Sequence, residues 1–170
     1  AASTKWNFHR HTPGIGDGGH CIPIDPHYYI EISKRYGVSS AMSPAARELN
    51  SSMPRYSAEE VIRLCGGSIP ERILVLGFSY KPNVSDSRET PVLPFVNELL
   101  AMGVRQILVW DPLMEENSFP DSVTSIAEPY GLEDIDCVVI ATAHDEFKQL
   151  NWEKLSKITS EPRIFDGRRC

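Results

Sequence analysis

A glycine-rich loop that ends in a cysteine is the segment of this sequence best suited to chemistry. Residues 12–26 are dense in glycine and proline, so their backbone must be irregular. Glycine backbone can approach a ligand closely, and its bare amides can hold anionic oxygens. Cys21 directly follows these glycines. It is therefore a candidate nucleophile, and the alternative is a buried, inert thiol, as free cysteines commonly are.

Residues 14–19 also match the pattern G-x-G-x-x-G of dinucleotide-binding folds. That pattern binds pyrophosphate only where it joins a strand to the N-terminus of a helix. Residues 9–13 do not have the pattern of a strand, and Pro23 and Pro26 follow closely. The sequence therefore predicts no dinucleotide site in this loop.

A metal site is the third interpretation of the loop. His20, Cys21 and His27, with or without Cys65, would supply the ligands. These residues lack the paired C-x-x-C or H-x-x-x-H spacing that is typical of zinc sites. We therefore expect no bound metal and keep a zinc-dependent module as an alternative.

The elements that must position the loop fall into two regions. Residues 1–70 combine the loop with helical patterns, whereas residues 71–170 alternate short apolar runs with amphipathic segments. In the second region Thr90 and Pro91 are typical of a helix N-terminus, and Gly103 is typical of a helix end. We expect strands at 72–76, 106–110, 136–141 and 163–165, and helices at 28–36, 44–50, 53–64, 91–102, 123–127 and 152–158.

Strands that alternate with helices predict right-handed crossovers and therefore an α/β fold with a parallel sheet. With the third strand on the far side of the first, the strand order in space is 2-1-3-4. The binding crevice of such a sheet lies beyond the carboxyl ends of its first and third strands. The loop from Phe78 to Arg88 leaves the first strand at this point.

Composition argues against several classes of function. The 170 residues carry a formal net charge of −6 with scattered basic residues, which argues against nucleic-acid binding. No apolar run approaches the length needed to span a membrane, and the first residues show no signal-peptide pattern. The four cysteines are far apart, which favours free thiols and a cytoplasmic location. Because residues 1–5 show neither an initiator methionine nor a targeting pattern, we expect a fragment of a longer protein.

The chain resembles the UDP-glucose/GDP-mannose dehydrogenase family along essentially its whole length. PGIGDGGHCIPIDP, residues 13–26, is similar to the family's catalytic loop, and its His-Cys-Ile-Pro form is similar to the UDP-N-acetylmannosamine dehydrogenase branch. Ile15 and Asp17 replace the usual proline and valine, and an acid there could weaken anion binding. Further matches are NSSMP at 50–54, LGFSYKP at 76–82, DSRETP at 86–91, WDP at 110–112, VIATAHDEF at 139–147 and FDGR at 165–168.

The resemblance implies an NAD-dependent nucleotide-sugar 6-dehydrogenase, which oxidises the sugar C6 alcohol to a carboxylate in two hydride transfers. Residues 1–70 would hold the catalytic loop and part of a helical central domain that forms a homodimer. Residues 71–170 would form a Rossmann-like domain that binds the UDP-sugar. The domain that binds most of the NAD would precede residue 1, as would the family's catalytic lysine and asparagine. The isolated chain is therefore expected to be inactive.

The resemblance also assigns roles to residues. Cys21 matches the nucleophile, which captures the intermediate aldehyde as a thiohemiacetal and then forms a thioester that water hydrolyses. Asp25 matches an acid that assists this water or orients the site, and a solvated helix-cap acid is the alternative. Asp86 is expected only to pair with Arg88 or to cap a helix. Lys5, Gly18, Tyr80, Lys81 and Arg168 match substrate-binding positions, and Arg88 matches a position that reaches NAD on a neighbouring domain.

The sugar stays open between N-acetylmannosamine, N-acetylglucosamine and glucose, and the oligomer size is also open. A nucleotide-sugar sensor that keeps the fold without catalysis is the main alternative to a dehydrogenase. The assignment as a dehydrogenase requires the Cys21 thiol to be reachable near the mouth between the first and third strands. A thiol packed among aliphatic side chains would contradict it.

Overall fold

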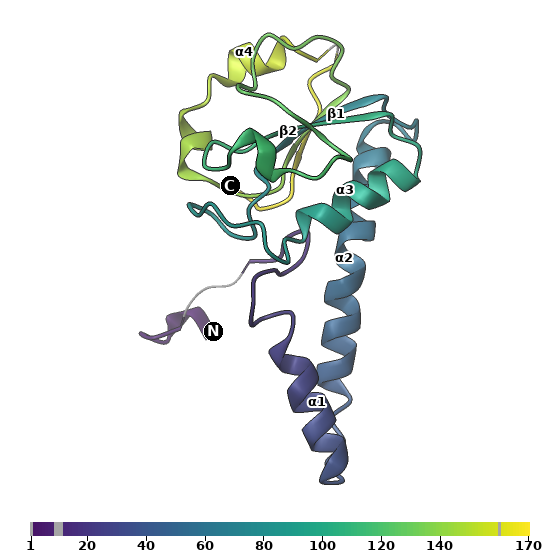
Figure 1. Ribbon diagram of the computed structural model, residues 1–170, viewed down its shortest axis with the longest axis vertical. Coiled ribbons are helices and arrows are strands. Elements are labelled where there is room, and N and C mark those ends of the chain that lie inside the picture. Colours follow the sequence, from purple (N-terminus) through teal and green to yellow (C-terminus); the bar gives the residue numbers. More distant parts are fainter. Residues whose placement is uncertain (1, 9–11, 160) are drawn as a thin grey trace.

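A five-stranded parallel sheet with helices on both faces stands at one end of a long helical hairpin (Figure 1). The computed structural model describes residues 2–8, 12–159 and 161–170. The hairpin consists of α1, Asp25–Arg35, and α2, Met42–Leu64, and α2 reaches back to the sheet. The predicted α/β class with a parallel sheet is therefore confirmed.

The strands of the sheet have the spatial order β3-β2-β1-β4-β5, and all neighbours are parallel. The strands are β1 Arg72–Leu76, β2 Gln106–Trp110, β3 Thr124–Ser125, β4 Cys137–Ile140 and β5 Ile164–Asp166. The four predicted strands thus lie in the predicted order 2-1-3-4. The first two also have the predicted bounds, and the other two agree within one residue at each end.

The central strand β1 separates two buried apolar clusters. Ile73 and Val75 belong to the cluster beneath α2 and α3, whereas Leu74 and Leu76 belong to the cluster on the opposite face. This alternation follows from the two-residue period of a strand. Burying each such side chain stabilises the fold by roughly 1.5–3 kcal/mol, so the sheet is a rigid support for the loops at its carboxyl edge.

The helix α3, Val92–Ala101, packs against α2 and covers one face of the sheet. Its start is fixed by Thr90, whose side-chain oxygen accepts a hydrogen bond from the Val92 N–H at 3.2 Å. Gly103 follows its end with a φ of 105°, a conformation that glycine adopts without strain. The remaining elements are the 3-10 helices η1 Ala2–Thr4, η2 Glu116–Ser118 and η3 Asp145–Gln149, and the helix α4 Trp152–Ser156.

The predictions for the hairpin need correction. The two helices expected at 44–50 and 53–64 form one continuous helix, α2, with Pro54 in its interior. An interior proline removes one backbone hydrogen bond, but Pro54 is buried, so its packing offsets part of this cost. The helix α1 begins at Asp25 rather than residue 28 because Pro26 fits the first turn of a helix. Among the described residues, no helix is both long and apolar enough to cross a bilayer.

The helix expected at 123–127 is wrong. Thr124 and Ser125 pair with Leu108 and Val109 of β2 and form the short edge strand β3. Val123 and Thr124 are β-branched and lose side-chain freedom in a helix, which favours the extended conformation. Pairing with β2 then fixes that conformation.

Candidate functional site

The glycine-rich loop packs closely on the carboxyl edge of the sheet. Ile15, one of the two departures from the family pattern, is fully buried in the cluster beneath α2 and α3, so it anchors the loop. A Cβ atom added at Gly18 would lie 2.5 Å from the Glu89 carbonyl oxygen, and one added at Gly14 would lie 2.6 Å from Arg168 Nη1. The glycines therefore let the loop approach both neighbours. Among the described residues, no strand directly precedes residues 14–19.

A cavity of about 650 Å³ lies between this loop, α2 and the sheet. Four of the predicted substrate-binding residues line it: Gly18, Tyr80, Lys81 and Arg168. Tyr80 and Lys81 follow β1, and Arg168 follows β5, which pairs with β4. The cavity thus lies at the edge where the strand order predicted a binding crevice. The residues contributed by the loop and α2 are Thr12, Pro13, Gly14, Gly16, Asp17, Ile22, Ala46, Leu49, Asn50 and Met53.

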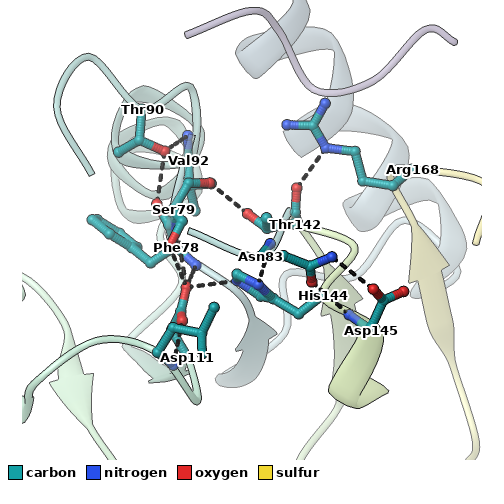
Figure 2. A network of polar contacts seen from close by, with 12 residues as sticks. Phe78, Ser79, Asn83, Thr90, Val92, Asp111, Thr142, His144, Asp145 and Arg168 are labelled. Carbon is teal, nitrogen blue, oxygen red and sulfur yellow. Dashed lines mark hydrogen bonds and ion pairs between the residues drawn. The ribbon is translucent and has the colours of Figure 1, made fainter. Parts of the chain in front are cut away.

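Arg168 presents a partly buried cation to this cavity. Its Nε donates a hydrogen bond to the Ala141 carbonyl oxygen at 2.8 Å, as Figure 2 shows. Its Nη2 is buried and has no hydrogen-bond partner among the described residues. Burial also lowers the pKa of the guanidinium. A bound anion would satisfy the free donor and the buried charge together.

Lys81 supplies a second cation on the same side of the cavity. Its Nζ lies 5.7 Å from the centre of the Tyr80 ring, within the range of a cation–π contact. Lys81 is otherwise exposed, so its ammonium group can turn towards a ligand. The sheet side of the cavity therefore carries two positive charges and an aromatic ring.

A buried carboxylate, Asp111, holds Phe78 and Ser79 at the start of the loop that follows β1 (Figure 2). Its Oδ2 accepts hydrogen bonds from the Phe78 N–H at 2.8 Å, from the Ser79 N–H at 3.1 Å and from the Ser79 hydroxyl at 2.9 Å. His144 Nε2 lies 3.1 Å from the same oxygen. Burial alone would raise the pKa of this carboxyl, but the bonds from His144 and the Phe78 amide more than offset burial, and the pKa falls to about 2. Asp111 is therefore ionised at neutral pH.

His144 joins this carboxylate to the far end of the same segment. Its Nδ1 accepts a hydrogen bond from the Asn83 N–H at 3.0 Å, so the ring proton is on Nε2 and is donated to Asp111. Asn83 has a φ of 60° and exchanges two further hydrogen bonds with Asp145. The segment 78–83 is thus fixed at both ends, and Tyr80 and Lys81 lie between them. Asp111 and His144 had no predicted role, although both belong to motifs that carry the family resemblance.

Cys21 is exposed and is not packed among aliphatic side chains. Its carbonyl oxygen accepts hydrogen bonds from the Ile24 N–H at 3.0 Å and the Asp25 N–H at 2.8 Å, which makes the turn that begins α1. The next residue, Ile22, lines the cavity. The thiol is therefore accessible, as a nucleophile requires. Asp25 is exposed as the first residue of α1, where an acid also suits the helix dipole.

The acid at position 17 is neutralised by α2. Arg47 Nη1 lies 2.8 Å from Asp17 Oδ2, and Asn50 Nδ2 donates to Asp17 Oδ1. The Asp17 N–H in turn donates to Asn50 Oδ1 at 3.0 Å. Arg47 therefore offsets part of the repulsion that Asp17 was expected to exert on a bound anion. Sequence spacing did not reveal the pair because 30 residues separate Asp17 from Arg47.

The other four predicted residues, Cys21, Asp25, Lys5 and Arg88, are not among the residues that line the cavity. Lys5 is exposed in the N-terminal segment. Arg88 pairs with Asp86 through two nitrogens, and this pairing was one of the two alternatives predicted for Asp86. The side chain of Arg88 is 69% exposed. The hydrogen bonds from Arg88 lower the pKa of Asp86. Within residues 2–8, 12–159 and 161–170, no three His, Cys, Asp or Glu residues are grouped so that they could hold a metal ion.

Comparison with known proteins decides the family. Residues 74–170 match the UDP-binding domain of the UDP-glucose/GDP-mannose dehydrogenase family, and residues 1–52 match the central domain of that family. The chain belongs to this family. It is 36% identical to a UDP-N-acetyl-D-mannosamine dehydrogenase of Pyrococcus horikoshii, over 98% of the chain and 38% of the relative. It is 32% identical to a UDP-N-acetyl-D-glucosamine 6-dehydrogenase of Pseudomonas aeruginosa, over 93% of the chain and 38% of that relative.

Solved structures of this dehydrogenase family have the same fold. The UDP-N-acetylmannosamine dehydrogenase of Pyrococcus horikoshii superposes with a TM-score of 0.79 at 33% identity, over 98% of the chain and 38% of that structure. A UDP-glucose dehydrogenase of Pyrobaculum islandicum gives a TM-score of 0.73 at 29% identity, over 88% of the chain and 38% of that structure. The chain thus spans 38% of the length of these relatives.

Proposed function

We propose that this chain is the C-terminal part of an NAD-dependent nucleotide-sugar 6-dehydrogenase whose substrate is UDP-N-acetylmannosamine. One observation carries the proposal: a single cavity combines two cations with glycine backbone and is lined by Ile22, the residue that follows the exposed Cys21. Residues 1–70 would contribute the loop and the dimerising helices, and residues 71–170 the UDP-sugar-binding domain. UDP-N-acetylglucosamine and UDP-glucose are the alternative substrates.

The two ends of the substrate would occupy different sides of the cavity. Lys81 and Arg168 would hold the diphosphate. Nη2 of Arg168, which has no hydrogen-bond partner within the described part of the chain, would donate to one of the diphosphate oxygens. The Tyr80 ring offers a flat apolar surface next to these cations, and the backbone of Gly18 allows close approach. Lys5 belongs to the same proposal as a further substrate contact from the N-terminal segment.

Cys21 would perform the covalent step. Its thiolate attacks the C6 aldehyde that the first oxidation produces, and the carbonyl oxygen gains a proton to give a thiohemiacetal. Loss of a hydride from C6 and of the hydroxyl proton gives a thioester. Water then adds to this thioester, the thiolate leaves, and the uronate is released. Asp25 would orient or deprotonate that water.

NAD would accept the hydride in both oxidations. This chain would have only an accessory part in binding that cofactor, which is supported by the flank of the loop 14–19: among the described residues, no strand directly precedes it. Arg88 fits such a part: its charge is partly compensated by Asp86, yet most of its side chain is exposed. It could thus contact a cofactor that another domain holds.

Two measurements test the proposal. Calorimetric titration of this chain with UDP-N-acetylmannosamine should show weak binding without NAD reduction, and NADH production by this chain alone would refute it. In the longer enzyme, Cys21→Ser should abolish uronate formation, whereas Cys170→Ser, at the other exposed cysteine, should leave it intact. Full activity of the Cys21→Ser enzyme would instead favour a nucleotide-sugar-binding module without thiol catalysis.

The same proposal includes a homodimer in the cytoplasm. The helix α1 has no buried residue and exposes Tyr28, Tyr29 and Ile32, which a partner helix could cover. All four cysteines are free, as a reducing compartment favours. Sedimentation of the chain should give twice its monomer mass of 19.1 kDa, and a monomer at micromolar concentration would contradict the dimer.

A further inference from the structure

The cavity has a carboxylate on a different side from its two cations. Asp17 and Asn50 line the side formed by the loop and α2, whereas Lys81 and Arg168 line the sheet side. Because the cations attract the diphosphate, the side of Asp17 and Asn50 is left to an uncharged part of the ligand. Cys21 is four residues from Asp17 in the same loop and must reach C6 of the sugar. The sugar ring therefore belongs on the side of Asp17.

The carboxylate of Asp17 is held rigidly while part of it stays open. Its side chain is 26% exposed, and that of its ion-pair partner Arg47 is 14% exposed. The two reciprocal hydrogen bonds with Asn50 fix the position of the carboxylate. Each of its oxygens can accept a further hydrogen bond. Arg47 compensates its charge, so the nearby diphosphate experiences less repulsion than from a lone acid.

We propose that Asp17 is a specificity-determining residue that accepts a hydrogen bond from a hydroxyl or acetamido N–H of the bound sugar. The inference rests on the proposed function, since it takes the ligand to be a UDP-sugar. A site that offers a fixed acceptor selects ligands with a matching donor, because the acceptor otherwise loses water without replacement. Arg47 and Asn50 act through Asp17 as positioning residues.

The test compares ligands with and without the sugar. Calorimetric titration of this chain gives the Kd of UDP and the Kd of UDP-N-acetylmannosamine. The Kd of UDP divided by the Kd of UDP-N-acetylmannosamine measures how much the sugar contributes to affinity. Asp17→Asn keeps the shape but removes the charged acceptor, so it should weaken UDP-sugar binding about tenfold or more and change UDP binding less than about twofold. Glu48→Gln makes the same charge change at an exposed position of α2 and should change neither Kd.

A second variant keeps the test decisive if Asp17→Asn fails to fold. The double substitution Asp17→Val with Arg47→Met removes the whole pair without leaving a buried charge. It should lower the Kd of UDP divided by the Kd of UDP-N-acetylmannosamine. Equal weakening of UDP and UDP-sugar, or no weakening of either, would overturn the role of Asp17. Failure of the unsubstituted chain to bind UDP at all would instead overturn the proposed function, and with it this inference.

Discussion

Asp111→Asn tests whether the buried carboxylate stabilises the segment 78–83. Asp111 is only 4% exposed, so solvent screens its contacts little. An asparagine can direct its oxygen towards the donors from Phe78, Ser79 and His144, but its NH₂ group then faces the Leu113 N–H, which now donates to Oδ1 at 3.0 Å. One donor must lose its partner, and the charge that strengthened the remaining bonds is gone.

The pKa gives the magnitude. The pKa of Asp111 falls from 3.8 to about 2 on folding. A difference of about 2 units corresponds to roughly 2–3 kcal/mol of stability at neutral pH. Because the folded pKa is the lower one, this contribution is fully present above about pH 4 and is lost as the pH falls from about 4 towards 2. Asp111→Asn should therefore cost about 2–3 kcal/mol at pH 7 and remove this part of the pH dependence.

Urea unfolding followed by circular dichroism measures the effect. With a slope of about 2 kcal/mol per molar urea, the midpoint should fall by roughly 1 M at pH 7. Asp121→Asn makes the same change at an exposed position and should alter stability by less than about 0.5 kcal/mol. If the two variants unfold at the same urea concentration, the hydrogen bonds of Asp111 are not stabilising and the reasoning fails.

Two further predictions concern backbone approach and thiol exposure. Gly77 has a φ of 85° and would place a Cβ 2.6 Å from Thr142 Cβ, whereas Gly37 has a φ of 69° with open space around it. Gly77→Ala should thus cost at least about 2 kcal/mol, and Gly37→Ala about 1 kcal/mol; equal urea midpoints would contradict the close approach. Ellman's reagent at pH 8 should label two thiols in the folded chain and four in urea, because Cys65 and Cys137 are buried and burial raises the pKa of Cys137 to about 12. Rapid labelling of all four thiols in the folded chain would contradict this.

The sequence predicted the sheet well because its signals are local. The runs at 72–76 and 106–110 are short, apolar and flanked by polar residues, and they became β1 and β2 with unchanged bounds. The edge strand β3 depends instead on pairing with β2, which no local pattern encodes. The continuity of α2 through Pro54 likewise depends on burial against distant residues.

In the candidate site, too, local motifs were predictable and contacts between distant residues were not. Motif resemblance selected Gly18, Tyr80, Lys81 and Arg168, and the fold brings all four to one cavity. The ion pair between Asp17 and Arg47 could not be derived, because it depends on how α2 crosses the loop. The same holds for the hydrogen bonds of Asp111 and His144, which join the ends of different strands. The role proposed for Cys21 is tested by the Cys21→Ser variant described above.

The continuity of α2 has a mechanical consequence. Its 23 residues form a rod of roughly 34 Å, buried between Pro54 and Val61 and free of the sheet at the hairpin end. Asn50, on the wall of the cavity, lies about 6 Å along the rod beyond Pro54. A tilt of about 10° around Pro54 would displace Asn50 by about 1 Å. A partner that binds the hairpin end could therefore change the width of the cavity from a distance.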